Sequence, residues 1–175
     1  ARVDVNTGHI NNDVNEALYN AVMAEQANHV AIILRRPDVN VNYVNEEESA
    51  TPLIAAVDNG DSDTVQAILA VGDKVDVNYE NSYGNTALYF AARAGHASVV
   101  EMLLRRADLN VNRQDEEGLT ALSHAASRGY AAIVNMILQR PDVNVIHAIY
   151  RGGKGISRRN AILQRLLEEV VQRSL

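Results

Sequence analysis

The chain has 175 residues, of which 47% are hydrophobic and 22% charged, so it can bury a continuous core and has neither a disordered nor a collagen-like composition. It contains no Cys, which excludes disulfide frameworks, Cys-ligated zinc and thiol catalysis and favours an intracellular, cytoplasmic protein. The net charge of -6 argues against a nucleic-acid partner, and the absence of a long apolar run argues against a membrane span.

A short block of residues recurs four times along the chain. Its copies begin 34 or 35 residues apart, and the apolar run after each copy ends with a leucine at the same interval. The copies are Glu16–Val22, Thr51–Ala56, Thr86–Ala92 and Thr120–Ala126, and the leucines are Leu34, Leu69, Leu104 and Leu138. This periodicity predicts four structural repeats.

Each repeat is predicted to form a helix, a turn, a second helix and a loop. The apolar residues of Ala97–Leu104 share one helical face, and Ser98 is predicted as the N-cap of that helix. Gly60, Gly95 and Gly129 fall between the two helices, where a left-handed residue ends the first helix. Because such short helices are marginal alone in water, we expect them to stack on their neighbours as a short solenoid.

The tetrapeptides TPLI, TALY and TALS begin the second, third and fourth repeats. Together with the stretch G-H-A-S-V-V-E-M-L-L and the D-V-N endings, they resemble ankyrin repeats over roughly residues 11–145. The resemblance implies an all-α ankyrin-repeat solenoid of helix-turn-helix units with projecting β-turn fingers. Leu53, Leu88 and Leu122 then occupy equivalent inward positions.

Two positions and two connections depart from the family pattern. Ser49 replaces the turn glycine found at Gly84 and Gly118, and Glu25 replaces the inter-helix glycine of the first repeat. The connection from Leu34 to Thr51 and the stretch 70–78 are each one residue longer than in the third repeat, so we expect both to bulge.

The chain is predicted to have three segments. Residues 1–10 are a remnant of a preceding repeat or an N-terminal extension, since Asp4–Asn6 is another D-V-N ending, and residues 11–150 hold the four repeats. Residues 151–175 have six Lys or Arg against two Glu, whereas residues 1–150 have ten basic and twenty acidic side chains. The apolar stripe from Ile162 to Val171 predicts a basic C-terminal capping helix in this last segment.

No residue spacing predicts catalysis, a cofactor or a metal site. The five histidines have no H-x-x-x-H spacing, the serines lack a G-x-S-x-G context, and Gly153–Ser157 does not match a phosphate-binding loop. We therefore expect no enzyme activity.

The family resemblance implies that the projecting turns and the exposed side of each first helix bind other proteins. The turns of the second and fourth repeats are acidic, which suggests a partner with a basic segment, although a solubilising rim explains the same charges. Tyr83 is the best candidate for an exposed aromatic anchor. The residues expected at the partner surface are Glu47, Glu48, Asp58, Ser82, Tyr83, Arg93, Glu116, Glu117 and Arg128.

The predicted function is that of a non-enzymatic scaffold or adaptor, which presents a concave surface of fingers and inner helices to another protein. A second hypothesis makes the repeats the targeting or substrate-recognition part of a larger multidomain enzyme or of a pathogen effector delivered into a host cell. Self-association of the basic cap with the acidic fingers is a third, less favoured hypothesis. A fold resemblance alone does not choose among these functions.

Overall fold

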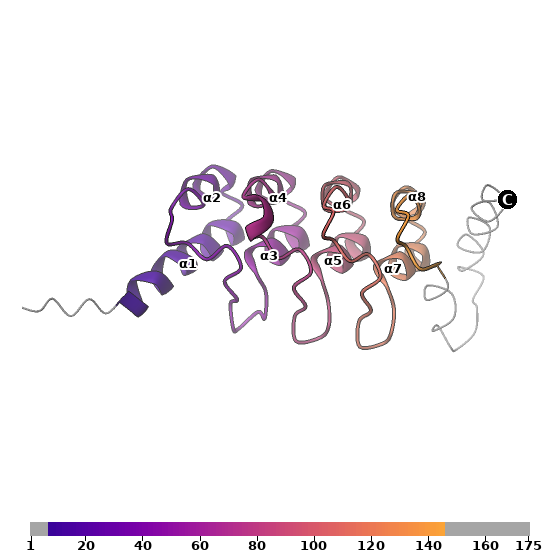
Figure 1. Ribbon diagram of the computed structural model, residues 1–175, viewed down its shortest axis with the longest axis horizontal. Coiled ribbons are helices and arrows are strands. Elements are labelled where there is room, and N and C mark those ends of the chain that lie inside the picture. Colours follow the sequence, from indigo (N-terminus) through magenta and orange to yellow (C-terminus); the bar gives the residue numbers. More distant parts are fainter. Residues whose placement is uncertain (1–6, 146–175) are drawn as a thin grey trace, which may run out of the picture. The chain divides into compact units, whose positions relative to one another are not determined.

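The computed structural model describes residues 7–145, which contain eight α-helices and one short 3-10 helix (Figure 1). The chain divides into two compact units, Ala1–Asp76 and Val77–Leu175. The first unit contains α1 (Thr7–Met23), α2 (Ala27–Ile33), α3 (Pro52–Asn59), α4 (Ser62–Leu69) and the 3-10 helix η1 (Gly72–Lys74). The second contains α5 (Ala87–Ala94), α6 (Ala97–Leu104), α7 (Ala121–Arg128) and α8 (Ala131–Leu138).

Within each unit, two helix pairs stack in two layers. In the first unit α1 packs against α3 and α2 against α4, while in the second α5 packs against α7 and α6 against α8 (Figure 1). Each first helix also contacts the second helix of its own repeat. The predicted all-α fold of stacked helix-turn-helix repeats is confirmed, whereas the predicted capping helix in residues 151–175 lies outside the described residues.

The recurring block supplies both the core and the start of the first helix. Leu53, Leu88 and Leu122 are 2%, 1% and 1% exposed, as their equivalent positions predicted. The threonines at the head of the block are buried N-caps. Their hydroxyl oxygens accept the backbone N–H three residues on, each at 3.3 Å, in the pairs Thr51 with Ile54, Thr86 with Tyr89 and Thr120 with Ser123.

The left-handed turns between helices occur at the positions predicted from the recurring glycines. Gly60, Gly95 and Gly129 cap α3, α5 and α7 with φ of 73°, 84° and 78°. Glu25 and Ser49, the two positions that depart from the glycine pattern, keep the same backbone conformation with φ of 55° and 50°. A side chain in this region is strained, because Cβ approaches the following carbonyl oxygen.

Replacing Glu25 or Ser49 by glycine is therefore expected to stabilise the protein. Relief of the left-handed strain outweighs the greater entropy of glycine in the unfolded chain, so each variant should raise the free energy of unfolding by roughly 0.5–1 kcal/mol. Chemical denaturation measures the change. Ser82→Gly is the matched control, since Ser82 is an exposed finger residue outside the left-handed region, and it should be neutral or destabilising. A loss of stability in Ser49→Gly would contradict the strain argument.

The predicted start of α6 is wrong. The N-cap of α6 is His96 and not Ser98, because the first helical hydrogen bond runs from Val100 N to the carbonyl oxygen of His96, and the His96 side chain makes no capping bond. Helix α1 begins at Thr7, inside the segment 1–10 that was assigned to a preceding repeat or extension, and residues 1–6 lie outside the described residues. At 17 residues, α1 is more than twice as long as the eight-residue α3, α5 and α7.

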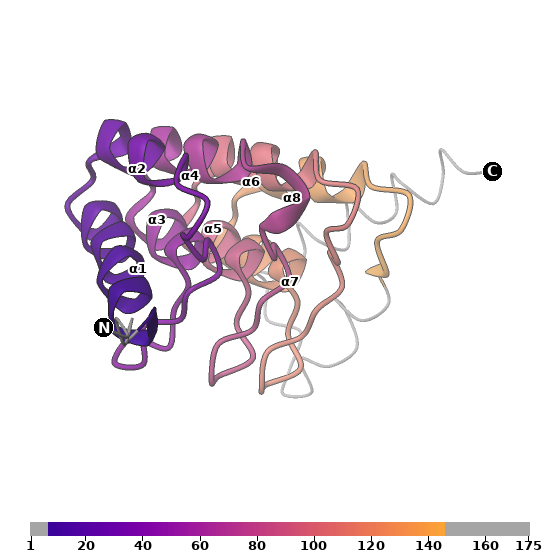
Figure 2. The same cartoon turned by 60° about the vertical axis from the view of Figure 1, so that its left-hand side comes forward.

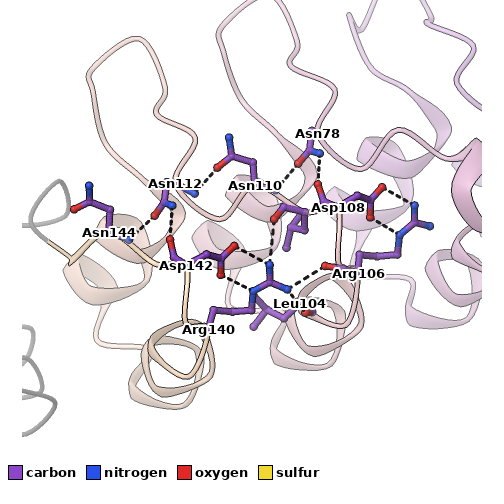
Figure 3. Close-up of polar contacts among 10 residues, drawn as sticks. Asn78, Leu104, Arg106, Asp108, Asn110, Asn112, Arg140, Asp142 and Asn144 are labelled. Carbon is purple, nitrogen blue, oxygen red and sulfur yellow. Dashed lines mark hydrogen bonds and ion pairs between the residues drawn. The ribbon is translucent and has the colours of Figure 1, made fainter. Parts of the chain in front are cut away.

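The asparagine of a Val-Asn pair in the loop after α2, α4 and α6 joins its loop to the next one. In the second unit the Asn78 amide donates to the carbonyl oxygen of Asp108 at 2.7 Å, and its side-chain oxygen accepts from Asn110 N at 2.7 Å (Figure 3). Asn112 makes the same pair of bonds to Asp142 and Asn144 at 2.7 and 2.6 Å (Figure 3). In the first unit Asn42 bonds Lys74 and Asp76 in this way.

Arginine side chains reinforce the loops of the second unit. Arg140 donates to the carbonyl oxygens of Leu104 and Arg106 at 3.0 Å and of Leu109 at 3.3 Å (Figure 3). It also pairs with Asp142, and this side-chain hydrogen bond lowers the pKa of that carboxyl below its usual value. Arg140 therefore satisfies the carbonyl oxygen of Leu104, the last residue of α6, and two carbonyl oxygens of the loop that follows.

Removal of the Asn112 side chain is expected to destabilise the second unit. Asn112→Ala loses two hydrogen bonds between loops and should lower the free energy of unfolding by about 1–2 kcal/mol, because each exposed bond contributes on the order of 1 kcal/mol or less. The control is Asn110→Ala, which removes a single side-chain hydrogen bond, the one that the Asn110 side-chain oxygen accepts from Asn112 N. Urea unfolding compares the two variants, and equal losses would argue against a structural role for the paired bonds.

Candidate partner-binding site

Three loops, called fingers here, precede α3, α5 and α7. The first finger is 45–50, the second 81–85 and the third 115–119. In the second unit, the second and third fingers run side by side away from the helices (Figure 2). A backbone hydrogen bond closes each finger: Asn45 N to Ala50 O at 3.0 Å, Asn81 N to Asn85 O at 3.1 Å and Asp115 N to Leu119 O at 2.9 Å.

An Asn or Asp at the first position organises each finger. The Asn45 side-chain oxygen accepts from the backbone N–H groups of Glu47 and Glu48, both at 3.0 Å. Asn81 binds the N–H groups of Tyr83 and Asn85 in the same manner, and Asp115 binds those of Glu117 and Leu119. These bonds hold the exposed tip residues on a defined backbone.

The two longer connections accommodate their extra residue differently. The first finger has one residue more between the two residues that close it than the second or third finger has. The additional residue of the Leu34–Thr51 connection therefore lies in the finger itself. In the stretch 70–78, the additional residue coincides with η1, where Gly72 has φ of 82°.

A cavity of about 250 Å³ opens between the second and third fingers. Finger residues and side chains of α5 and α7 form its wall, and all of them belong to the second unit. The lining residues are Tyr83, Asn85, Tyr89, Asp115, Glu116, Glu117 and His124. Gly84 is required by its left-handed backbone, with φ of 71°, and not by space, because a Cβ there would make an ordinary contact of 3.6 Å with the Asp115 Cα atom.

A hydrogen bond between His124 and Asp115 joins the third finger to α7. The His124 Nε2 atom lies 2.8 Å from the Asp115 Oδ2 atom, and the two side chains are only 15% and 8% exposed. Since Asp115 Oδ1 already accepts two backbone N–H groups, both carboxylate oxygens serve the structure of the finger. Asp115 and His124 are therefore positioning residues for the cavity.

Two lining residues, Tyr89 and His124, belong to a cluster of aromatic rings. The Tyr89 ring meets the rings of Phe90 and His124 edge to face, with centroid distances of 5.2 and 4.7 Å. The guanidinium carbon of Arg93 lies 5.6 Å from the Tyr89 centroid and 5.4 Å from that of Phe90. Arg93, one of the residues predicted to contact a partner, is thus half-buried against its own aromatic neighbours.

The predicted surface residues divide between the two units. Glu47, Glu48 and Asp58 belong to the first unit, and the other six belong to the second. All are exposed except the half-buried Arg93, and Tyr83 is 63% exposed. The structure brings Tyr83, Glu116 and Glu117 together around the cavity, which Ser82, Arg93 and Arg128 do not line.

Sequence reasoning missed four lining residues, namely Asn85, Tyr89, Asp115 and His124, as parts of one site. An Asp and a His nine residues apart match no motif, although Phe90 and Ala55 at the positions equivalent to His124 could have marked it as unusual.

In the first unit, Glu48 of the first finger influences a buried tyrosine of α1. Burial, together with the negative charge of Glu48 and a smaller effect of Tyr43, raises the pKa of Tyr19 to about 12. Tyr19 is 4% exposed and stays protonated at neutral pH. The negative charge of Glu48 therefore affects the ionisation of a buried side chain in this unit.

In the part of the chain that the structure describes, no group of three or more His, Asp or Glu residues could hold a metal ion. No helix among residues 7–145 is both long and apolar enough to span a bilayer.

The repeats match a known family model. The model described as ankyrin repeats (3 copies) matches residues 18–115 and 74–147. Inversin of Mus musculus is 32% identical over 72 residues, which are 41% of this chain and 7% of that protein. Inversin of Danio rerio is 31% identical over 83 residues (47% and 8%), and the 60 kDa lysophospholipase of Mus musculus is 49% identical over 53 residues (30% and 9%). The matched segments thus span less than a tenth of each of these relatives.

Proposed function

The chain belongs to the ankyrin repeat family, and on that basis we propose that it is an adaptor whose acidic fingers bind a basic segment of a partner protein. Ankyrin repeats are generally protein–protein interaction modules, and the repeat itself is a non-catalytic fold. Selectivity in such a module comes from side chains on a rigid frame, so that little loop entropy is lost when the partner binds.

The observation that carries the proposal is the pairing of exposed acids with an exposed aromatic side chain. Glu116 and Glu117 are exposed, and within the described residues their carboxylates have no ion-pair partner. Tyr83 of the neighbouring finger is 63% exposed, and tyrosine is enriched among the residues that dominate binding energy at protein interfaces. Uncompensated carboxylates attract a cationic segment and accelerate its association.

The test compares charge reversals as baits in affinity capture from cell lysate. Glu116→Lys/Glu117→Lys in the third finger and Glu47→Lys/Glu48→Lys in the first should each lose the proteins that wild type captures. For an identified partner, calorimetry should then give at least about tenfold weaker binding, and wild-type affinity should fall as salt is raised.

The matched control is Asp63→Lys/Asp73→Lys, which changes the net charge equally at exposed positions outside the fingers. Retention of the same partners by the control, together with their loss from the finger variants, would support the proposal. Capture of identical proteins by all baits would make the acidic tips a solubilising rim. Sedimentation of the chain alone at low and high salt tests self-association through the basic residues 151–175.

A second function is that of a targeting or substrate-recognition part within a larger multidomain enzyme or effector. Support comes from the similarity to a lysophospholipase over 53 residues, which are 9% of the length of that enzyme. Both functions use the same fingers, and location in the cytoplasm stays a prediction for either. Identification of the full reading frame around this chain would separate an adaptor from a recognition part of an enzyme.

A further inference from the structure

The cavity between the second and third fingers has a size that suits one side chain. Its volume of about 250 Å³ lies just below the range of about 300–1,000 Å³ that is typical of small-molecule pockets. A nucleotide or a comparable cofactor would therefore fill it poorly. The long, flexible side chain of an extended segment laid across the two fingers would fit a cavity of this size.

The charge of the lining favours a cation. Three carboxylates line the cavity, and no Lys or Arg does. The Asp115 oxygens are engaged by two backbone N–H groups and by His124, so Asp115 fixes the wall. Glu116 and Glu117 are the two lining carboxylates that remain for an incoming cation.

The aromatic lining favours a planar cation. Tyr83 and Tyr89 both contribute to the wall, and the Tyr83 ring is largely exposed. Arg93 already lies over the Tyr89 and Phe90 rings at 5.6 and 5.4 Å, so this aromatic cluster holds one guanidinium outside the cavity lining. A guanidinium stacks on aromatic faces and pairs with carboxylates through two parallel hydrogen bonds, whereas an ammonium is a compact, strongly hydrated charge.

We propose that this cavity receives a single arginine side chain of the partner, with Tyr83 stacked on the guanidinium and Glu116 and Glu117 accepting its hydrogen bonds. The proposal rests on the proposed function, because it supplies the residue by which a basic segment is recognised. Asp115 and His124 position the third finger. Both Asp115 carboxylate oxygens and the His124 Nε2 atom are already hydrogen-bonded within the protein, so these atoms do not bind the arginine.

The test is an NMR titration of the full chain with the blocked peptide acetyl-Gly-Arg-Gly-amide. The peptide should give saturable shifts that concentrate on the backbone amides of the second and third fingers and on His124. The neutral isostere with citrulline in place of arginine should give none at the same concentration, and the lysine peptide should bind several-fold more weakly. Absence of saturable shifts with arginine, equal shifts with citrulline, or equal binding of lysine would overturn the assignment.

Matched variants locate the site. Tyr83→Leu keeps an apolar side chain but removes the π face and should weaken the arginine peptide about two- to thirtyfold. Glu116→Gln/Glu117→Gln should weaken it as well, whereas Glu47→Gln/Glu48→Gln in the first finger should leave its affinity unchanged. Thermal unfolding verifies that these exposed variants remain folded.

The results of the two experiments separate the two proposals. If Glu116→Lys/Glu117→Lys loses a captured partner but the wild-type chain does not bind the arginine peptide, the adaptor function is supported and the proposal of an arginine-binding cavity is overturned. Specific binding of the arginine peptide, with partner capture insensitive to finger reversals, would leave the cavity and overturn the proposed mode of partner binding.

Discussion

Leu88→Ala is expected to lower the free energy of unfolding by about 2–5 kcal/mol. Leu88 is 1% exposed at the equivalent inward position of α5, and removal of its side-chain atoms loses their burial and leaves a cavity that the stacked helices fill only partly. Urea unfolding followed by circular dichroism measures the loss as a lower midpoint at an unchanged slope.

The control for this variant is Ile32→Ala. Ile32 is a large aliphatic residue of α2 that is 60% exposed, so its truncation should cost less than about 1 kcal/mol. A loss below about 1 kcal/mol in Leu88→Ala as well would place this leucine outside the core and contradict the register of the four repeats.

Gly95→Ala is expected to be the more damaging of two otherwise equivalent glycine substitutions. Gly95 ends α5 with φ of 84°, where any other residue costs about 1–2 kcal/mol, and a Cβ there would also lie 2.8 Å from the Tyr130 Cζ atom. Displacement of this ring adds a packing cost of about 1–3 kcal/mol. Thermal and urea unfolding should therefore show a total loss of about 2–5 kcal/mol.

Gly129→Ala isolates the backbone contribution. Gly129 has nearly the same φ of 78°, but a Cβ at this position would meet no atom within 4 Å, so only the left-handed strain of about 1–2 kcal/mol remains. Combining Gly95→Ala with Tyr130→Ala in a double-mutant cycle should remove the excess cost. Equal losses at the two glycines would show that Tyr130 moves aside freely.

The local features of the repeats were predictable because they depend on a few adjacent residues. Glycine adopts positive φ without a Cβ clash, and this fixed the ends of α3, α5 and α7 in advance. The same register marked Glu25 and Ser49 as departures, and both have the left-handed backbone of the glycines that they replace. Helix starts were less certain, as the misplaced N-cap of α6 shows, because several neighbouring positions satisfy the same pattern.

The finger positions were predictable from the repeat register, but their arrangement as a site was not. Tyr83, Glu116 and Glu117 were identified as exposed turn residues, whereas the cavity that they share required the approach of two fingers some 30 residues apart. The bond between His124 and Asp115 and the packing of Arg93 on Tyr89 depend on how α5 and α7 stack. Side-chain contacts of this kind have no periodic signature.

By itself, the sequence determined the number of repeats, the all-α class, the buried leucines and the left-handed turns, since periodic burial and backbone conformation are encoded within each repeat. Only the tertiary structure decided which side chains meet: the bonds of Asn78 and Asn112 to the following loops, the Arg140 contacts to the end of α6, and the cavity between two fingers. The physical reason is that these contacts join residues of different repeats, and their distances follow from helix stacking, which no single repeat specifies.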